Sequence, residues 1–407
     1  MTSAEQDRGA AAGALVYSRV VEVHELARIA EGRFGEYVEA LRDMVSVDCG
    51  SYTPVGVNRI ADMCSARFEA GGWAVERTPH RPSDGKPQLG DLVVGRLEGA
   101  GGPRILMIGH TDTVFDPGTT AERPFRVDGA RAHGPGVSDM KGGLLGAFFA
   151  VEVLQAAGFD GFGSITYVCN PDEEIGSPVS GPVIRELVKQ ADHALVFESA
   201  RENGDIVSAR KGVTDYRVEI VGRAAHAGVE PEKGRSAVLE AAHKSIALHE
   251  LNGRWPGVTV NVGLVYGGTR TNVVPERCVL EIDLRSPAEE TLVAAEEEIG
   301  RILTDPVVPD VQIMVHRNGW HRPMEKTQAT ARLAAVAVDI ASELGFELRD
   351  AATGGASDAN TTSAAGVPTL DGLGPVGGDD HAPGEWIDLT SVVPRIALVA
   401  GIVSRLR

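Results

Sequence analysis

The sequence has few cysteines, no long apolar run and a shortage of basic residues, and each of these excludes a class of protein. Its four cysteines fall in no paired spacing and no CxxC occurs, so we expect reduced, structural thiols and a cytoplasmic location. No stretch approaches the roughly eighteen apolar residues of a membrane span. Residues 1–28 have mixed charge and lack the apolar core of a signal peptide.

The charge balance is acidic. The 407 residues include 39 Lys and Arg against 57 Asp and Glu, a formal net charge of -18 at pH 7. Because this surplus repels nucleic acids and anionic membranes, we expect neither as a partner. A hydrophobic content of 43% is typical of a soluble globular protein, and the length predicts two domains, or one large domain with an insertion.

The stretch around His110 combines a buried strand with polar side chains. An unbroken apolar run, Ile105 to Ile108, ends at a glycine and is followed by His110 and Asp112. Such a run predicts a strand buried on both faces, as in a parallel sheet. Side chains two apart in an extended segment point the same way, so Asp112 can fix the His110 tautomer and leave the other ring nitrogen for a metal. The structural alternative is a strand-end histidine capped by a loop aspartate.

Further strands also end in carboxylates. Asp172, Glu173 and Glu174 follow the predicted strand 163–169, and Glu198 follows the predicted strand 193–197. This placement is typical of open α/β sheets, which carry their chemistry at the carboxyl ends of strands. The other strands predicted for this sheet are 74–78, 91–97 and 368–370, and the predicted helices are 34–47, 144–157, 330–344 and 389–405. We expect a tail or loosely docked helix at 1–30 and a loop at 119–137.

The middle of the chain has a different pattern. Its strands alternate apolar and polar residues, as half-exposed antiparallel strands do. The predicted strands are 216–220, 258–264, 278–284 and 311–315, and the predicted helices are 234–251 and 292–303. The order β-α-β-β-α-β is that of a ferredoxin-like unit. We therefore predict an α/β catalytic domain from residues 1–213 and 323–407, interrupted by a ferredoxin-like α+β domain at 214–322.

Five candidate metal ligands come from separate parts of the chain. They are His110, Asp139, Glu174, Glu198 and His381, each at a strand end or in a Gly- and Pro-rich turn. Imidazoles and carboxylates without thiolates suit zinc, and five ligands suit two ions that share a carboxylate better than one tetrahedral ion. Taken singly, each has a structural alternative: Asp139 as a helix N-cap, Glu174 in a solvated acidic turn, His381 in a surface loop.

Seven short strings, in this order, carry a family resemblance. GHTDTV, GPGVSDMKGG, PDEEIGS, GRAAHAG, TNVVP, DLR and TGGASDAN resemble the co-catalytic di-zinc amidohydrolase and carboxypeptidase superfamily, and most closely its bacterial glutamate carboxypeptidase branch. The resemblance covers residues 33–405. It implies an α/β zinc-peptidase domain whose catalytic sheet is mostly parallel, a ferredoxin-like lid that mediates homodimerisation, and a small-molecule substrate.

The resemblance also implies how the metals are held. His110 and Glu198 would bind one zinc ion, Glu174 and His381 the other, and Asp139 would bridge them, with a cis peptide bond after it. Co²⁺ or Mn²⁺ are possible substitutes. Two such ions can polarise an amide carbonyl and lower the pKa of a shared water towards ~7.

By the same resemblance, three side chains would serve catalysis. Asp112 would orient His110, and Glu173 would act as the general base that passes the water's proton to the leaving nitrogen. His226 of one subunit would stabilise the oxyanion in the partner's site.

Four further residues would contact the substrate. They are Asn272, Arg285, Arg322 and Gly355. A planar guanidinium can hold a carboxylate with two parallel hydrogen bonds, which is the role expected of Arg285. Arg322 has a hinge arginine as its structural alternative, and His133 and His321 are interpreted as loop histidines.

We therefore predict a zinc-dependent hydrolase that cleaves an amide bond to an amino acid with a free carboxylate. In the family that the strings resemble, Glu at the position of Glu198 is typical of carboxypeptidases and acyl-amino-acid hydrolases. The alternatives are a deacylase of the acetylornithine or succinyl-diaminopimelate type and an inactive binding scaffold, which the retention of every ligand and of Glu173 disfavours. No serine stands in a GxSxG context, so a serine hydrolase is unsupported.

Overall fold

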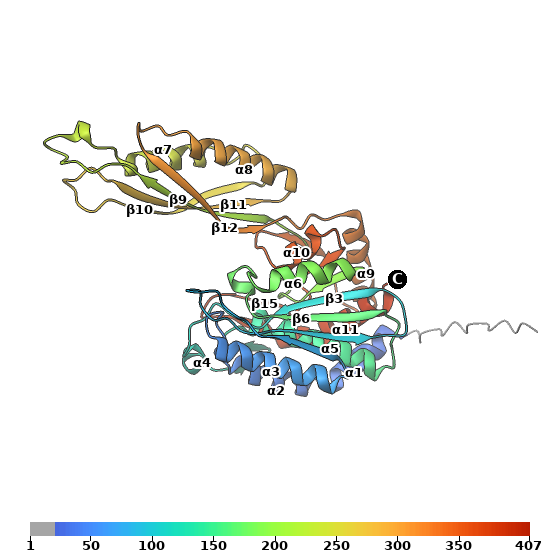
Figure 1. Cartoon of the computed structure of the whole chain (residues 1–407). Helices are drawn as coiled ribbons and strands as arrows, with labels where there is room; N and C mark the ends of the chain where they lie inside the picture. Colours follow the sequence, from blue (N-terminus) through green and yellow to red (C-terminus); the bar gives the residue numbers. More distant parts are fainter. Residues whose placement is uncertain (1–20) are drawn as a thin grey trace, which may run out of the picture.

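The computed structural model describes residues 21–407, and its largest sheet has six strands in the order β1-β2-β6-β3-β7-β14 (Figure 1). These strands are β1 (Ala74–Thr78), β2 (Leu92–Glu98), β3 (Arg104–His110), β6 (Ser164–Asn170), β7 (His193–Val196) and β14 (Thr369–Leu370). β6, β3, β7 and β14 run parallel to one another, and β2 runs antiparallel to β6. The predicted mostly parallel sheet is confirmed.

The sheet is buried on both faces, as the apolar run in β3 predicts. Ile105 and Met107 belong to one buried cluster, whereas Leu106 and Ile108 belong to another. Because successive side chains of a strand point to opposite faces, the two sets lie on the two sides of the sheet. The second cluster is completed by α6 (Ser180–Leu187) and by α10 (Asp358–Ala364).

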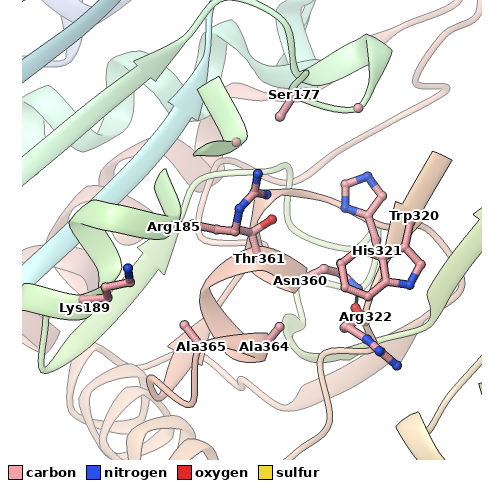
Figure 2. A pocket seen from close by; sticks show the side chains of 12 residues that line it. Ser177, Arg185, Lys189, Trp320, His321, Arg322, Asn360, Thr361, Ala364 and Ala365 are labelled. Carbon is pink, nitrogen blue, oxygen red and sulfur yellow. Dashed lines mark hydrogen bonds between the residues drawn. The ribbon is translucent and has the colours of Figure 1, made fainter. Parts of the chain in front are cut away.

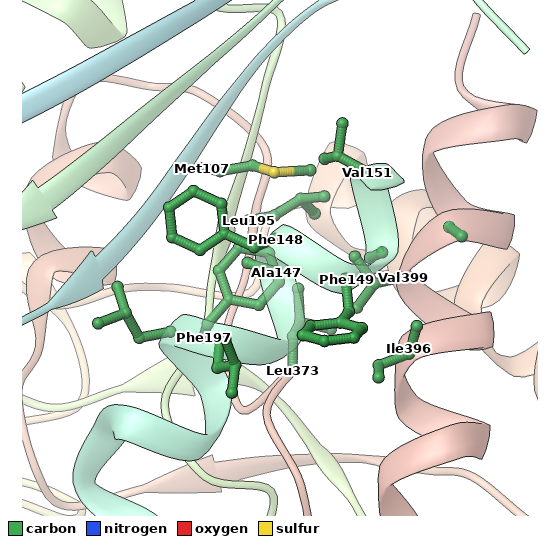
Figure 3. Packing of buried hydrophobic residues seen from close by; sticks show 14 of the residues in the cluster. Met107, Ala147, Phe148, Phe149, Val151, Leu195, Phe197, Leu373, Ile396 and Val399 are labelled. Carbon is green, nitrogen blue, oxygen red and sulfur yellow. The ribbon is translucent and has the colours of Figure 1, made fainter. Parts of the chain in front are cut away.

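The first cluster is built around α5 (Gly142–Ala156), which lies between the sheet and α11 (Leu389–Arg405). Figure 3 shows Phe148 on the side of Met107, and Phe149 on the side of Val399 of α11. A helix that is apolar on every side is stable only when it is covered on every side, which is why α5 occupies the centre of the domain.

Four further helices complete this layer: α1 (Val23–Gly32), α2 (Phe34–Val45), α3 (Pro54–Ala70) and α9 (Gln328–Leu344). The prediction of a loosely docked segment before residue 30 is wrong for α1, because Val23, Leu26 and Ala30 are buried against α5 and α11. Residues 1–20 of that prediction lie outside the described part of the chain. The pattern did not predict α3, although proline at its first position is typical of a helix start.

The predicted loop at 119–137 contains regular structure. It holds α4 (Thr119–Glu122), β4 (Arg126–Asp128) and β5 (Arg131–His133). β5 pairs with β16 (Trp386–Asp388), which pairs with β15 (Gly377–Gly378). The loop prediction was wrong because these short strands depend on a partner that lies more than 250 residues away in the chain. A separate parallel pair joins β8 (Ile206–Arg210) to β13 (Asp350–Thr353).

The inserted unit has the predicted ferredoxin-like order. Its elements are β9 (Gly212–Val221), α7 (Ala237–His249), β10 (Thr259–Gly267), β11 (Arg277–Ser286), α8 (Glu289–Thr304) and β12 (Gln312–His321). The strands form an antiparallel sheet in the order β10-β11-β9-β12, and α7 and α8 lie on one side of it (Figure 1). This unit, called the lid below, has its own core. We propose 214–322 as its limits.

Among residues 21–407, no helix combines the length and the apolar character needed to cross a membrane.

Candidate metal centre

The carboxyl ends of parallel strands bring the predicted ligands together. His110 is the last residue of β3, Glu174 lies in the turn after β6, and Glu198 follows β7. The other two stand on loops, Asp139 in the turn that leads into α5 and His381 after β15. Four of the five line one open cleft of about 400 Å³, and His110 is buried next to it.

Asp139 lies between the two histidines. Its Oδ1 is 2.8 Å from His110 Nε2, and its Oδ2 is 3.0 Å from His381 Nε2. His110 Nε2 also lies 3.9 Å from Glu198 Oε1, and His381 Nε2 lies 3.2 Å from Glu174 Oε2. One imidazole and one carboxylate therefore stand on each side of a shared aspartate. The Asp139–Met140 peptide bond is cis, as the resemblance implies.

Carboxylates outnumber histidines in this cluster, and this surplus, together with burial, shifts the pKa values of its members. Burial, with the charge of neighbouring carboxylates, raises the pKa of Glu173 and Glu198 well above their ordinary value. Hydrogen bonds with Asp139 and Glu174 raise the pKa of His381 to about 11. Although burial opposes it, hydrogen bonds from the two histidines hold the pKa of Asp139 below its ordinary value.

One carboxylate oxygen in this cluster has no hydrogen-bond partner among the described residues. Glu174 Oε1 is buried and accepts no hydrogen bond from any described residue. Donor atoms of His110, Asp139 and Glu174 lie within 4.8 Å of one another, as do those of His110, Glu173 and Glu198. A divalent cation would satisfy the orphaned oxygen and balance the surplus negative charge, so the residues fit a metal centre.

Asp112 acts in a way that the sequence revealed only in part. The backbone oxygen of Asp112 lies 3.0 Å from His110 Nδ1 and its carboxylate lies 3.5 Å away, so the carbonyl is the nearer acceptor. An Nδ1–H donated there leaves Nε2 free for a metal. The carboxylate accepts the backbone N–H groups of Glu173 and Glu174, both at 3.2 Å, and the hydroxyl of Ser51 at 2.7 Å. Asp112 therefore positions the turn that carries the predicted base.

Glu385 was not found from the sequence. It is 2% exposed, and its carboxylate accepts the backbone N–H groups of Gly136 (2.9 Å), Ser138 (2.8 Å) and Asp139 (3.0 Å). These three bonds hold the turn from which the Asp139 side chain projects. The only sequence signal was a position shortly after His381.

Three arginines, Arg201, Arg210 and Arg285, line the same cleft. Arg285 of β11 donates from Nε and Nη2 to Asp283, at 3.0 Å each, and from Nη1 to the Gly354 carbonyl at 2.8 Å. A guanidinium has five N–H groups. Two of those of Arg285 therefore have no acceptor among the described residues, and Arg285 lines the cleft.

The second arginine, Arg210, was missed because nothing in its local sequence distinguishes it. It ends β8 and is almost fully buried, and it donates to Asp371 at 2.7 Å and to the Gly355 carbonyl at 3.0 Å. Gly355 itself lines the cleft. Gly355 therefore lies near the site, as predicted, and has only its backbone to offer a substrate.

His226 and Asn272 lie on the lid and do not line the cleft of their own chain. Both are exposed, and the neighbouring Ala227 N–H donates to the Asn272 carbonyl at 3.0 Å. The two residues are therefore adjacent, as their predicted joint role requires. Action in a partner's site stays a prediction.

Arg322 lies outside the cleft as well. It pairs with Glu289, stacks on the Trp320 ring at 4.6 Å, and lines a neighbouring cavity. His321, interpreted from the sequence as a loop histidine, is instead the last residue of β12 and lines the metal cleft. The loop interpretation was wrong because β12 extends past the alternating pattern through Trp320.

Comparisons with known proteins agree with this geometry. The family described as "Peptidase family M20/M25/M40" matches residues 106–405. The chain is 29% identical to carboxypeptidase G2 of Pseudomonas sp. (strain RS-16), covering 90% of this chain and 88% of that protein. It is 28% identical to succinyl-diaminopimelate desuccinylase of Leptothrix cholodnii, covering 82% and 89%. The crystal structure of aminopeptidase PepT from Bacillus cereus matches with a TM-score of 0.75 at 25% identity, covering 91% and 98%.

The family match includes the strand ends and loops that carry all five candidate ligands. The chain therefore belongs to peptidase family M20/M25/M40, within the co-catalytic zinc amidohydrolase and peptidase superfamily and near its glutamate carboxypeptidase branch.

Proposed function

We propose that the chain is a hydrolase with two co-catalytic zinc ions that cleaves an amide bond whose leaving amino acid carries a free carboxylate. The observation that carries this proposal is that one cleft is lined both by the acid cluster and by guanidinium groups, those of Arg285 and Arg210 among them. The metal cluster could bind the carbonyl oxygen of an amide, and a guanidinium with two free N–H groups could bind a carboxylate through two hydrogen bonds.

The metal ligands in this proposal are His110 and Glu198 for one ion, Glu174 and His381 for the other, and Asp139 for both. Bound zinc, or Co²⁺ or Mn²⁺ in its place, would polarise the scissile carbonyl. Glu173, whose backbone N–H is held by Asp112, takes the proton of the attacking water and delivers it to the leaving nitrogen.

The substrate's carboxylate lies against Arg285, which Asp283 holds from the other side. Because an ammonium group cannot form two parallel hydrogen bonds, lysine at this position binds the carboxylate less well. The second candidate is a deacylase of the desuccinylase or acetylornithine deacetylase type. It is favoured by the 28% identity to a desuccinylase over 364 residues.

We further propose a homodimer formed through the lid. β10 is an edge strand, and its Leu264, Val265 and Tyr266 are 45%, 53% and 54% exposed. An apolar edge strand of this kind is a template for pairing with another chain. In such a dimer His226 and Asn272 of one lid would enter the partner's cleft. The four buried, free cysteines support a reducing, cytoplasmic location.

The test is a panel of N-acyl and peptidyl amino acids, each beside its α-carboxamide, assayed with the zinc-loaded full chain. We expect hydrolysis of the free acids alone, lost with a chelator and restored by zinc. Arg285→Lys should raise KM for the free acids by about tenfold or more, since a bidentate charged contact is lost. Arg277→Lys, at the exposed far end of the same strand, is the matched control. Equal hydrolysis of acids and carboxamides contradicts the proposal.

A further inference from the structure

A second cavity, of about 500 Å³, lies where the lid meets the catalytic domain (Figure 2). Its walls come from α6, from α10 and from the end of β12. Arg185 of α6 and Lys189, just after α6, line it on one side. Trp320, His321 and Arg322, at the end of β12, line it on another.

The lining of this cavity is cationic in an acidic protein. It includes Arg185, Lys189 and Arg322 and not one Asp or Glu, although the whole chain has a net charge of -18. Lys189 pairs with Glu186 at 2.7 Å, and Arg322 pairs with Glu289.

Arg185 differs from the other two cations, because it has no carboxylate partner in the part of the chain that the structure describes. Figure 2 shows its guanidinium facing the His321 ring, with Lys189 and Arg322 towards the edges of the view. The nearby Asn360 amide donates to the carbonyls of Lys211 and Arg322 and accepts the N–H of Ser357. The cavity therefore contains an arginine that is not paired with a carboxylate of any described residue.

The second cavity adjoins the metal cleft. Gly176 and His321 line both, and a Cβ placed on Gly176 would lie 3.7 Å from His321 Nε2. Gly176 follows the candidate ligand Glu174 by two residues. The metal cleft and the second cavity therefore meet along Gly176 and His321.

The lid sheet sets the distance between the backbone of Arg285 and that of His321, which borders both spaces. Arg285 pairs with Val213 and Val213 pairs with His321, so the three residues form one row across β11, β9 and β12. Residues directly opposite one another point to the same face, and neighbouring strands lie about 4.8 Å apart, which places Arg285 and His321 about 10 Å apart. About three extended residues span that distance.

We propose that the second cavity binds a carboxylate on the acyl side of the scissile amide, so that the preferred substrates carry negative charge on both sides of that bond. This inference rests on the proposed function, which places the leaving carboxylate at Arg285. The acyl half then crosses the row to His321 and meets Arg185 beyond it. Burial, with the charge of Arg185, lowers the pKa of His321.

The first experiment measures binding without catalysis. Trp320 lines the cavity and is 44% exposed, so its fluorescence reports on an anion there. We expect glutarate to change the fluorescence of the zinc-loaded protein saturably, and Trp320→Phe to remove that signal. Arg185→Ala should weaken glutarate binding about tenfold, since a charge-assisted contact is lost. Arg59→Ala, an exposed arginine on α3, is the matched control.

The same titration with inorganic phosphate separates two sources of anionic oxygens. Saturable binding of phosphate without binding of glutarate would overturn the proposal and make the cavity a phosphate site. A glutarate response that Arg185→Ala leaves unchanged overturns it as well.

The second experiment compares N-glutaryl and N-pentanoyl derivatives of one amino acid, which differ only in the terminal carboxylate. Arg185→Ala should lower kcat/KM about tenfold for the glutaryl compound alone, and Arg185→Lys should restore part of the loss, because it restores the charge. Equal losses on both compounds overturn the inference and leave the proposed function intact. Hydrolysis of neither by the wild type overturns the proposed function, and with it the assignment of the cavity to an acyl group.

Discussion

Glu385→Gln tests whether a buried carboxylate remote from the metals holds the turn that carries Asp139. In the wild type, Oε1 of Glu385 accepts the N–H groups of Ser138 and Asp139, and Oε2 accepts that of Gly136. Glutamine has one acceptor oxygen and one amide nitrogen. If its oxygen keeps the first two bonds, its NH₂ group faces the N–H of Gly136, so that two donors meet.

The magnitude follows from these three bonds. A hydrogen bond to a charged group contributes about 1.5–3 kcal/mol, and a bond between neutral groups about 0.5–1.5 kcal/mol. Glu385→Gln removes one bond of the first kind and converts two to the second. Together these changes sum to about 3.5–6 kcal/mol. Burial raises the pKa of Glu385 to about 7, so glutamine also relieves the cost of burying the charge, and we expect the free energy of unfolding to fall by about 2–4 kcal/mol at about pH 8. Because the turn shifts when its anchor is lost, zinc affinity should also fall, by about 10–100-fold.

Two measurements check this. Urea unfolding of the metal-free protein gives the change in the free energy of unfolding, and competition with a chromophoric chelator gives zinc affinity. Glu297→Gln, an exposed glutamate on α8, is the control and should change stability by less than about 0.5 kcal/mol. An unchanged urea midpoint together with unchanged zinc affinity in Glu385→Gln would refute the reasoning.

Two further predictions concern catalysis. Glu173→Gln should retain metal content while kcat falls by about 10²–10⁴, because a general base is lost and the ligands stay; loss of metal in step with activity would make Glu173 a ligand. His226→Ala and Glu173→Ala should each be nearly inactive, and mixing them under conditions of subunit exchange should restore activity towards half that of wild type within the heterodimers. A mixture that exchanges subunits and gains nothing excludes action of His226 across the interface.

Local patterns predicted the parts of the fold that depend on local physics. The apolar run Ile105–Ile108 indicated a strand buried on both faces, and its side chains divide between two clusters. Alternation in the middle of the chain indicated half-exposed strands, and the lid has the expected order β9-α7-β10-β11-α8-β12. These features follow from side-chain periodicity, which neighbouring residues determine.

Residue types and local patterns were enough to indicate which side chains could hold metal, because the chemistry of imidazole and carboxylate belongs to the residue type and their strand-end positions belong to the local pattern. The sequence also indicated the family, through short strings in a set order. Asp139 lies within hydrogen-bond distance of both His110 and His381, in the arrangement that the resemblance implies.

The residues that support the site could be identified only in the folded chain. Glu385 reaches Asp139 across 246 residues, and Arg210 reaches Gly355 across 145. Each of these bonds depends on two backbone segments that only the completed sheets bring together. The sequence around Arg210 therefore gives no sign of its bond, and for Glu385 the only sign is its position shortly after His381. The same holds for the second cavity, whose cation on α6 faces the end of a lid strand. Its anionic ligand is a hypothesis that only the folded chain could suggest.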